Sequence, residues 1–285
     1  MIQPMHAPAA PLPRPDMAAP ATPRRTSMRL LRPVASGARV LLGVGFFVAI
    51  LLLWTAVTAM GLVAPNFLPG PAQVLQSGVR LFTEFGFIRD VGVTVWRVMG
   101  GFLLAAVIAV PLGIAMGAYK PIEALIEPLV SFARYLPASA FIPLMILWLG
   151  IGESQKLAVI FIGCFFQLTL MVMMIVGSAR RDLIEAAYTL GSNDGSVIRR
   201  VLLPGAAPEI AEALRQVLGL GWTYVVVAEL IGAASGIGHM IMDSQALMAT
   251  DNIIAGIVII GLVGLVSDVL FKKLNQRLFA WSLMR

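Results

Sequence analysis

The feature that most constrains this chain is a series of long apolar runs without charge. Val40–Met60 and Val98–Ala118 each hold 21 residues and Leu157–Ala179 holds 23, with no Asp, Glu, Lys or Arg among them. About 20 apolar residues cross the hydrocarbon core of a bilayer as a helix. Only 13% of the residues are charged, against about 25% in ordinary soluble domains. The sequence therefore predicts an all-α membrane protein that crosses the bilayer several times.

Three less uniform segments bring the expected number of transmembrane helices to about six. They are Tyr135–Gly152, roughly Leu214–Ala234, and Ile253–Phe271. The first of these carries Pro137 and Pro143, which a span tolerates only where packed neighbours satisfy the freed backbone groups. We expect a broken helix beside Pro137. Asp268 lies near the end of the last one, and we expect it to pair with Lys272, one helical turn away.

The Lys and Arg residues are distributed unevenly along the chain. With the N-terminus in the cytoplasm, 15 of them fall on the cytoplasmic side and three, Arg80, Arg89 and Lys156, fall outside. Cytoplasmic loops carry the excess of Lys and Arg, so we expect both termini inside. Residues 1–38 hold eight of the 18 prolines and little that could form a core. We predict a disordered, basic cytoplasmic tail there, followed by one membrane domain over 39–285.

The cytoplasmic loop over 177–208, between the fourth and fifth spans, carries the strongest local signals. Asp182 and Glu185 have the spacing of a capping box at the start of a helix. Gly191 suits the left-handed residue that ends a helix. The sequence thus predicts a short helix over 183–190.

A second short helix is expected after that glycine. Asn193 can cap its start, and Pro204 is expected to end it near Leu202. Both helices are too short to be stable alone. Ala186 and Ala187 leave one face of the first helix almost bare. Physical chemistry alone allows two roles, an element that docks into a groove of a soluble partner and an amphipathic helix at the membrane surface.

Seven residues of this loop form a spaced pattern: Glu185, Ala186, Ala187, Gly191, Val201, Leu203 and Pro204. The pattern resembles the EAA signature of binding-protein-dependent ABC importer permeases, with valine at 201 in place of the usual isoleucine. Further motifs look like the sulfonate/nitrate/taurine branch, among them Arg97-Val-x-Gly-Gly-Phe, Ala228-Glu229-Leu230-Ile231 and Phe279-Ala-Trp281. The resemblance covers roughly residues 90–282.

The resemblance implies a multi-pass permease of the bacterial inner membrane. Two copies would form a pathway, each presenting helix 183–190 as a coupling helix to a cytoplasmic ABC ATPase dimer, with Glu185 contacting a basic residue of the ATPase. A periplasmic or lipid-anchored binding protein would deliver the substrate. None of the four lysines follows a glycine, whereas a phosphate-binding loop needs Gly-Lys-Ser/Thr. We therefore expect no enzymatic activity and no cofactor in this chain, with ATP and Mg bound by the ATPase.

Polar side chains in or near the spans are candidates for the translocation path: Arg97, Arg134, Arg215, Tyr224 and Glu229. Guanidinium groups bind oxyanions in a bidentate manner. For Arg97 and Arg215 we prefer the alternative that they snorkel to the membrane interface. For Arg134 we favour neither contact with the substrate nor a purely structural role over the other. A bare carboxylate would repel an anion, so for Glu229 we favour a structural pair, with an arginine as one candidate partner.

The chain alone does not select the substrate. A sulfonate or taurine, nitrate, another small organic anion and a nitrogen heterocycle all fit the branch, and export is the alternative direction. A membrane scaffold or an intramembrane enzyme is the competing class. Both histidines lie outside the spans and Cys164 has no evident base, which argues against an enzyme. His239 and Asp243 are too few for a metal site, the single cysteine excludes an internal disulfide, and we expect no nucleic-acid partner.

Overall fold

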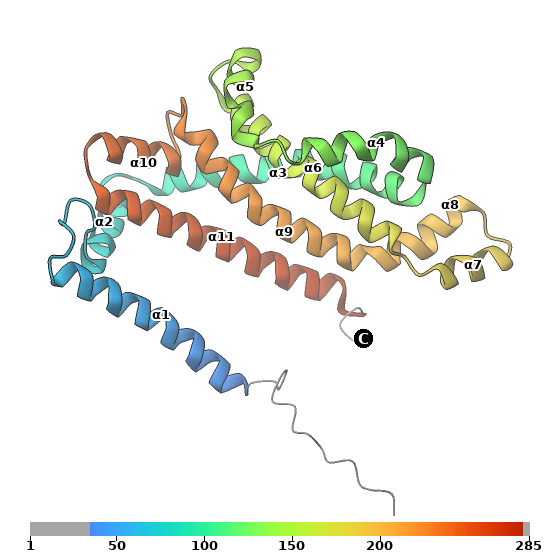
Figure 1. Cartoon of the computed structure of the whole chain (residues 1–285), viewed down its shortest axis with the longest axis horizontal. Helices are drawn as coiled ribbons and strands as arrows, with labels where there is room; N and C mark the ends of the chain where they lie inside the picture. The colour runs from blue at the N-terminus through green and yellow to red at the C-terminus, as the bar shows by residue number, and fades with distance from the viewer. Residues whose placement is uncertain (1–34, 282–285) are drawn as a thin grey trace, which may run out of the picture. The chain divides into compact units, whose positions relative to one another are not determined.

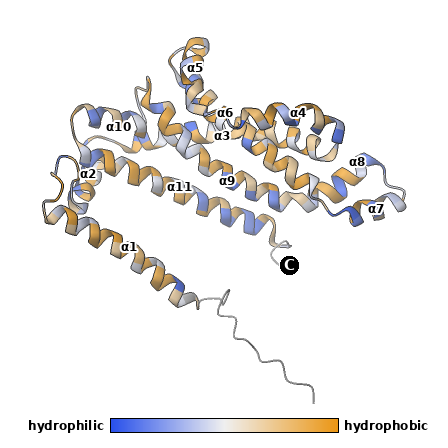
Figure 2. Cartoon of the chain, in the orientation of Figure 1, coloured by the Kyte–Doolittle hydropathy of each residue, from blue (hydrophilic) through white to orange (hydrophobic). Residues whose placement is uncertain are grey.

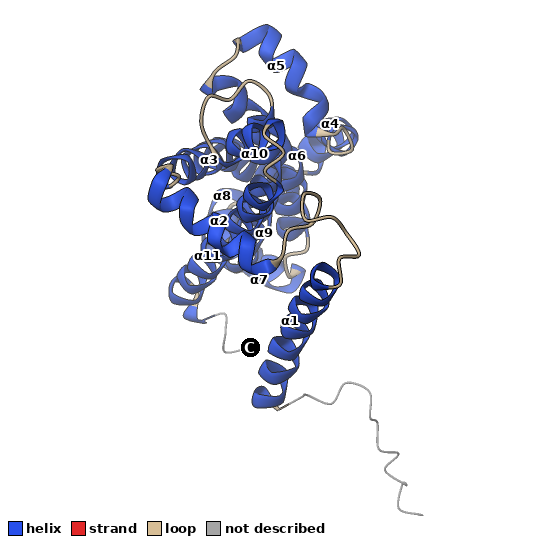
Figure 3. Cartoon of the chain, turned by 90° about the vertical axis from the view of Figure 1, so that its left-hand side faces the viewer, coloured by secondary structure: helices blue, strands red, loops and turns tan. Residues whose placement is uncertain are grey.

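The computed structural model describes residues 35–281, and this part of the chain contains helices and loops but no strand (Figures 1 and 3). The helices are α1 (Ser36–Ala59), α2 (Pro71–Glu84), α3 (Ile88–Ala118), α4 (Lys120–Ala133), the 3-10 helix η1 (Ala138–Phe141), α5 (Ile142–Leu149), α6 (Glu153–Gly177), α7 (Arg181–Thr189), α8 (Asp194–Val197), the π-helix η2 (Ile198–Leu202), α9 (Leu203–Leu230), α10 (Ile237–Ala246) and α11 (Thr250–Leu278). The predicted tail over 1–38 lies almost entirely outside the described residues, and its last three residues belong to α1.

Four helices of the described part, α1, α3, α6 and α11, are long and apolar enough to cross a membrane. α1 is largely orange in Figure 2. The fourteen residues of α4 and the pair η1–α5 pass the same test together and bring the number to five if they count as one span. α9 is long, with 28 residues, but polar residues such as Arg215 and Glu229 make it less apolar. The all-α membrane fold is confirmed, while six spans and cytoplasmic termini stay predictions.

The predicted span Tyr135–Gly152 is not one continuous helix. α4 ends at Ala133, Pro137 has extended backbone angles, and η1 with α5 then runs at 86° to α4. The twelve residues of η1 and α5 reach only about 20 Å, which is shorter than the ~30 Å hydrocarbon core. This segment can cross the bilayer only together with α4.

Helix α3 packs closely along α6, and small residues make that approach possible. A Cβ atom added at Gly113 would lie 2.7 Å from the carbonyl oxygen of Thr169, and one added at Gly117 would lie 2.6 Å from that of Met173. The two glycines are four residues apart, as are their two partners, so both pairs lie on the facing sides of the helices. Glycine at these positions lets two membrane helices bring their backbones together.

Helix α9 completes the core by packing against α6 on one side and α11 on another. Against α6, the ring of Tyr224 packs on Gly163 so closely that a Cβ atom added at Gly163 would lie 2.5 Å from two ring carbons. Against α11, Trp222 Nε1 donates a hydrogen bond to Ser267 Oγ at 3.0 Å. The buried side chains of α3, α6 and α9, among them Phe102, Ile160 and Val217, form one continuous apolar cluster. α3, α6 and α9 thus form one packed unit.

Candidate functional site

The hairpin predicted over 177–208 is present as α7, α8 and η2, which lie beyond the ends of α6 and α9 (Figure 1). Gly191 has φ of +81°, the left-handed conformation expected after the first helix. Asn193 caps α8 by accepting a hydrogen bond from Ser196 N at 2.9 Å. Tyr188 Oη donates to Asp194 Oδ1 at 3.0 Å and joins the two arms; this bond and the nearby negative charge raise the pKa of the Tyr188 phenol.

Two details of this hairpin differ from the prediction. Asp182 is not the N-cap of α7, which is Arg180, and no side chain caps the helix start. Asp182 instead accepts from the Arg180 guanidinium (Nη2–Oδ2 2.5 Å), which lowers the pKa of the Asp182 carboxyl. Pro204 does not end the second helix, because η2 leads directly into α9. There the proline lies in the first turn, where its missing N–H costs little.

α7 packs little against the rest of the chain, and most of its residues are exposed. None of its residues is buried; Glu185 and Ala186 are exposed, and Ala187 is half-buried. Between α7, the end of α6 and the start of α9 lies an open cavity of about 640 Å³. Its apolar lining includes Leu183, Ile184, Val201, Leu202 and Ala206. An exposed carboxylate beside small residues, on a helix with little packing of its own, can bind a basic group on another protein.

Two of the five predicted path residues meet at one cavity. Arg134, just after α4, and Tyr224 of α9 line an open space of about 350 Å³ together with Gln167 of α6. The Arg134 guanidinium donates to Tyr135 Oη at 2.9 Å and lies 4.8 Å from the centre of that ring. Within the described residues it forms no salt bridge with a carboxylate. The cavity therefore combines an unneutralised cation, an amide and a phenol.

Gln167 was not predicted as a site residue. Its position near the middle of the uncharged run Leu157–Ala179 is the signal that could have found it, because a polar amide side chain at that depth needs a partner or a cavity.

Arg97 and Glu229 do not line that cavity but form a buried ion pair. Each has 1% of its surface exposed, and Arg97 Nη1 lies 2.7 Å from Glu229 Oε1. The structural pair favoured for Glu229 is confirmed. The snorkelling preferred for Arg97 is wrong, because its guanidinium is enclosed by protein and bonded to two carboxylates, those of Glu229 and Glu153.

Arg215 is likewise committed to carboxylates. Its Nη1 lies 2.7 and 2.9 Å from the two oxygens of Asp268, and its Nη2 lies 2.5 Å from Glu212 Oε1. The predicted pair of Asp268 with Lys272 is therefore wrong, since the guanidinium of α9 offers Asp268 two parallel hydrogen bonds. This contact joins α9 to α11.

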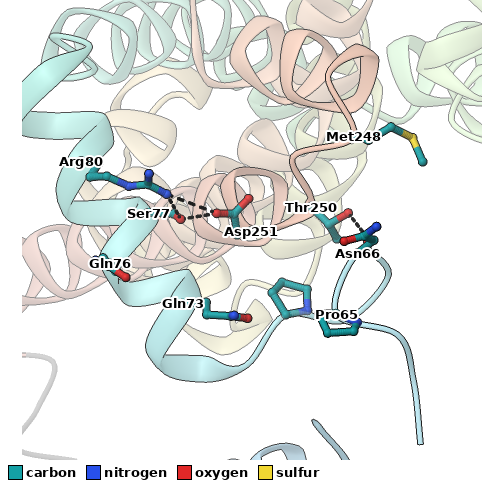
Figure 4. Close-up of a pocket in the computed structure, with 10 residues that line it drawn as sticks. Pro65, Asn66, Gln73, Gln76, Ser77, Arg80, Met248, Thr250 and Asp251 are labelled. Atoms are coloured by element: carbon teal, nitrogen blue, oxygen red, sulfur yellow. Dashed lines mark hydrogen bonds and ion pairs between the residues drawn. The ribbon is translucent and has the colours of Figure 1, made fainter. Parts of the chain in front are cut away.

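A third cavity, of about 700 Å³, lies where α2 meets the start of α11 (Figure 4). Ser77 Oγ donates to the Asp251 carboxylate, and Arg80 Nη2 contacts both, at 3.0 Å from Ser77 Oγ and 3.5 Å from Asp251. Thr250 Oγ1 donates to the Asn66 carbonyl at 2.6 Å. These bonds tie the segment before α2, and α2 itself, to α11.

Comparison with known proteins decides the family. Residues 109–280 match the family described as "Binding-protein-dependent transport system inner membrane component". The chain belongs to this family. It is 34% identical to the taurine transport system permease protein TauC of Escherichia coli (strain K12), over 85% of this chain and 90% of that protein. It is 39% identical to a probable ABC transporter permease protein of Brucella abortus (strain 2308), over 80% and 90%.

A third relative of the permease is the putative aliphatic sulfonates transport permease protein SsuC of Bacillus subtilis (strain 168), at 32% identity over 81% of this chain and 84% of that protein. Among solved structures, an inward-facing MetNI methionine ABC transporter superposes with a TM-score of 0.59 at 18% identity, covering 68% of this chain and 96% of that chain. That likeness concerns the fold. The chain is thus a multi-pass inner-membrane permease of the ABC importer type, and the matched region includes the α7–η2 hairpin and the Arg134–Tyr224 cavity.

Proposed function

We propose that this permease imports a small sulfonate, with taurine the foremost substrate, when it assembles with partner subunits. The observation that carries the proposal is the exposed EAA hairpin in a chain that is 34% identical, over 85% of its length, to a taurine transport permease. The likeness to an aliphatic sulfonates permease points to the same substrate class. A binding protein outside the membrane would deliver the anion, and a second copy of this chain would complete the path through the lipid bilayer.

ATP hydrolysis by the ATPase would be coupled to the permease through α7. Its open face presents Glu185 and Ala186 to a cytoplasmic ATPase subunit, which would bind ATP and Mg. The Tyr188–Asp194 bond and the chain through η2 into α9 support a transfer of motion from α7 to the membrane helices, because η2 continues into α9 without a loop. A docking helix displaced by the ATPase dimer would turn α9, and with it one wall of the cavity.

The path for the anion would run past the Arg134–Tyr224 cavity. Arg134 offers a guanidinium free of carboxylate pairing within the described residues, and Gln167 and Tyr224 offer hydrogen-bond donors nearby. A sulfonate carries three acceptor oxygens and matches such donors. We assign Arg97, Arg215 and Glu229 to structural ion pairs instead of direct contact with the substrate.

Growth tests the proposal. A strain that lacks only this gene is grown on taurine, on alkanesulfonates and on sulfate as sole sulfur sources, and on nitrate as sole nitrogen source. We expect failure on taurine or alkanesulfonates with normal growth on sulfate. Failure on nitrate alone would overturn the substrate class.

The same strain tests the coupling role when it is complemented with variants. Glu185→Arg is expected not to restore growth, because an arginine would repel a basic group of the ATPase. Glu84→Arg is the matched control, a charge reversal at an exposed residue at the end of α2. Full growth with Glu185→Arg would refute the coupling role of α7.

A further inference from the structure

Arg97 joins three separate parts of the permease. Its Nη1 donates to Glu229 Oε1 of α9 and to the carbonyl oxygen of Ser235, both at 2.7 Å. Its Nε and Nη2 donate to the two oxygens of Glu153, the first residue of α6, at 2.7 and 2.5 Å. One buried guanidinium on α3 thereby links α6, α9 and the α9–α10 loop.

The α9–α10 loop is bonded to the same face of α3. Gly236 N donates to Asp90 Oδ1 at 2.7 Å, and Ile237 N donates to Thr94 Oγ1 at 2.9 Å. Asp90, Thr94 and Arg97 are spaced four and three residues apart, so they lie in one row along the helix. Successive amides of the loop thus find acceptors on successive turns of α3.

Glu229 receives three kinds of donor. Besides Arg97, Thr94 Oγ1 donates to it at 2.9 Å and Gly238 N at 2.8 Å. A carboxylate buried this completely is stable only when its oxygens are satisfied. We name the group of Asp90, Thr94, Arg97, Glu153, Glu229 and residues 235–238, which lead into the first turn of α10, the Arg97 clamp.

The glycine just before α10 and the glycine in its first turn are both required by this geometry. Gly236 has φ of +110°, and a Cβ atom there would lie 2.5 Å from Glu229 Oε1 and 2.6 Å from Arg97 Nη1. A Cβ atom at Gly238 would lie 2.6 Å from Cβ of Glu229. Only glycine fits at these two positions, because any side chain there would collide with the Arg97–Glu229 pair.

We infer that the Arg97 clamp makes the adjoining ends of α3, α6, α9 and α10 one rigid body that keeps its internal contacts while the permease changes conformation. Arg97, Thr94 and Glu229 are then positioning residues for transport, which hold the α9–α10 loop in place without touching the substrate. α3 and α9 are joined through a buried, fully paired ion pair, Arg97–Glu229, and the half-exposed carboxylate of Glu153 joins α6 to the same guanidinium. These elements move together more readily than they separate, because separation would leave the buried charges without their partners. This inference rests on the proposed function, in that it assumes a transport cycle.

Hydrogen exchange of the loop tests the inference directly. The complete transporter, with its ATPase, is placed in lipid nanodiscs, and exchange of the amides of Gly236, Ile237 and Gly238 is followed without nucleotide and after trapping with ATP and vanadate. We expect equally slow exchange in both states, with changes elsewhere marking the transition. Faster exchange of these amides by about tenfold on trapping, which is the effect of losing one hydrogen bond, would overturn the inference. This result does not depend on which substrate is transported.

Paired variants at Thr94 separate a positioning role from a merely structural one. Thr94→Val keeps the shape but leaves Ile237 N without its acceptor, whereas Thr94→Ser keeps the hydroxyl. For Thr94→Val we expect an assembled complex with loop exchange about tenfold faster and a lower maximal uptake rate at unchanged KM. Thr94→Ser should restore both values. Asp243→Asn is the control, because the salt bridge that Asp243 forms in the described part of the chain stays within α10, with His239 at 3.3 Å. Normal uptake by Thr94→Val with fast loop exchange would refute the positioning role.

Discussion

Replacing Gly113 with alanine tests the packing on which the rest of the fold depends. The added Cβ atom would lie 2.7 Å from Thr169 O and 2.7 Å from Val172 Cβ, where ordinary contacts begin near 3.4 Å. α3 and α6 would have to separate by about 0.7 Å, and a backbone carbonyl cannot move aside as a side chain can. Overpacking of this kind costs about 1–3 kcal/mol, while alanine returns up to about 1 kcal/mol of helix propensity. We expect a net loss of about 1–2 kcal/mol.

The assay is the unfolding free energy of the purified permease in detergent micelles, with the apparent melting temperature as a second measure. Gly261→Ala is the matched control, because Gly261 lies within α11 and an added Cβ would meet nothing within 4 Å. It should be neutral or slightly stabilising. If Gly113→Ala were as stable as Gly261→Ala, the close approach of α3 to α6 would be wrong.

Four further substitutions examine other contacts. Asp268→Ala should lower stability by up to about 1 kcal/mol, and Lys272→Ala by less, because Asp268 pairs with Arg215 (2.7 Å); equal melting temperatures would contradict this. Gly191→Ala forces an L-residue to φ of +81°, which costs roughly 1–2 kcal/mol, so limited proteolysis should cleave the α7–α8 turn faster; an unchanged rate would count against it. Arg97→Ala removes the cation that pairs with the buried Glu229 carboxylate and should lower the free energy of unfolding by about 3–5 kcal/mol. The measurement is the yield of folded protein on size exclusion. A normal yield with normal stability would refute the pairing.

Local signals in the sequence predicted much of the fold. The uncharged runs predicted α1, α3 and α6, because length and apolarity alone decide whether a helix can cross a membrane. Gly191 and Asn193 predicted the turn between α7 and α8, since each acts through its own backbone or a residue three positions away.

Contacts across long sequence separations could not be predicted in the same way. Asp268 has a lysine one turn away, yet it pairs with Arg215, 53 positions before it, because only the packing of α9 on α11 brings the guanidinium there. Charge counting alone assigns Lys156 to the outside. It lies in the first turn of α6 with 2% of its surface exposed, and its Nζ donates to Gly152 O at 3.0 Å. Arg97 was predicted to snorkel because its partner Glu229 is 132 positions away in the sequence, and nothing near Arg97 in the sequence indicated that pair.

In the candidate site, too, local features could be predicted from the sequence and long-range contacts could not. The EAA hairpin could be located from the spacing of Glu185, Gly191 and Pro204, whereas the cavity required the folded chain. Arg134, Gln167 and Tyr224 come from three elements, and the 86° bend after α4 brings the first of them to the other two. Pro137 predicted a break there but not its angle.

The most direct test of the account is uptake by purified components. The permease, its ATPase and its binding protein are reconstituted in proteoliposomes, and accumulation of radiolabelled taurine is measured with and without ATP. We predict ATP-dependent accumulation that is lost in Glu185→Arg and retained in Glu84→Arg. Accumulation without ATP, or ATP-dependent accumulation that persists in Glu185→Arg, would contradict it.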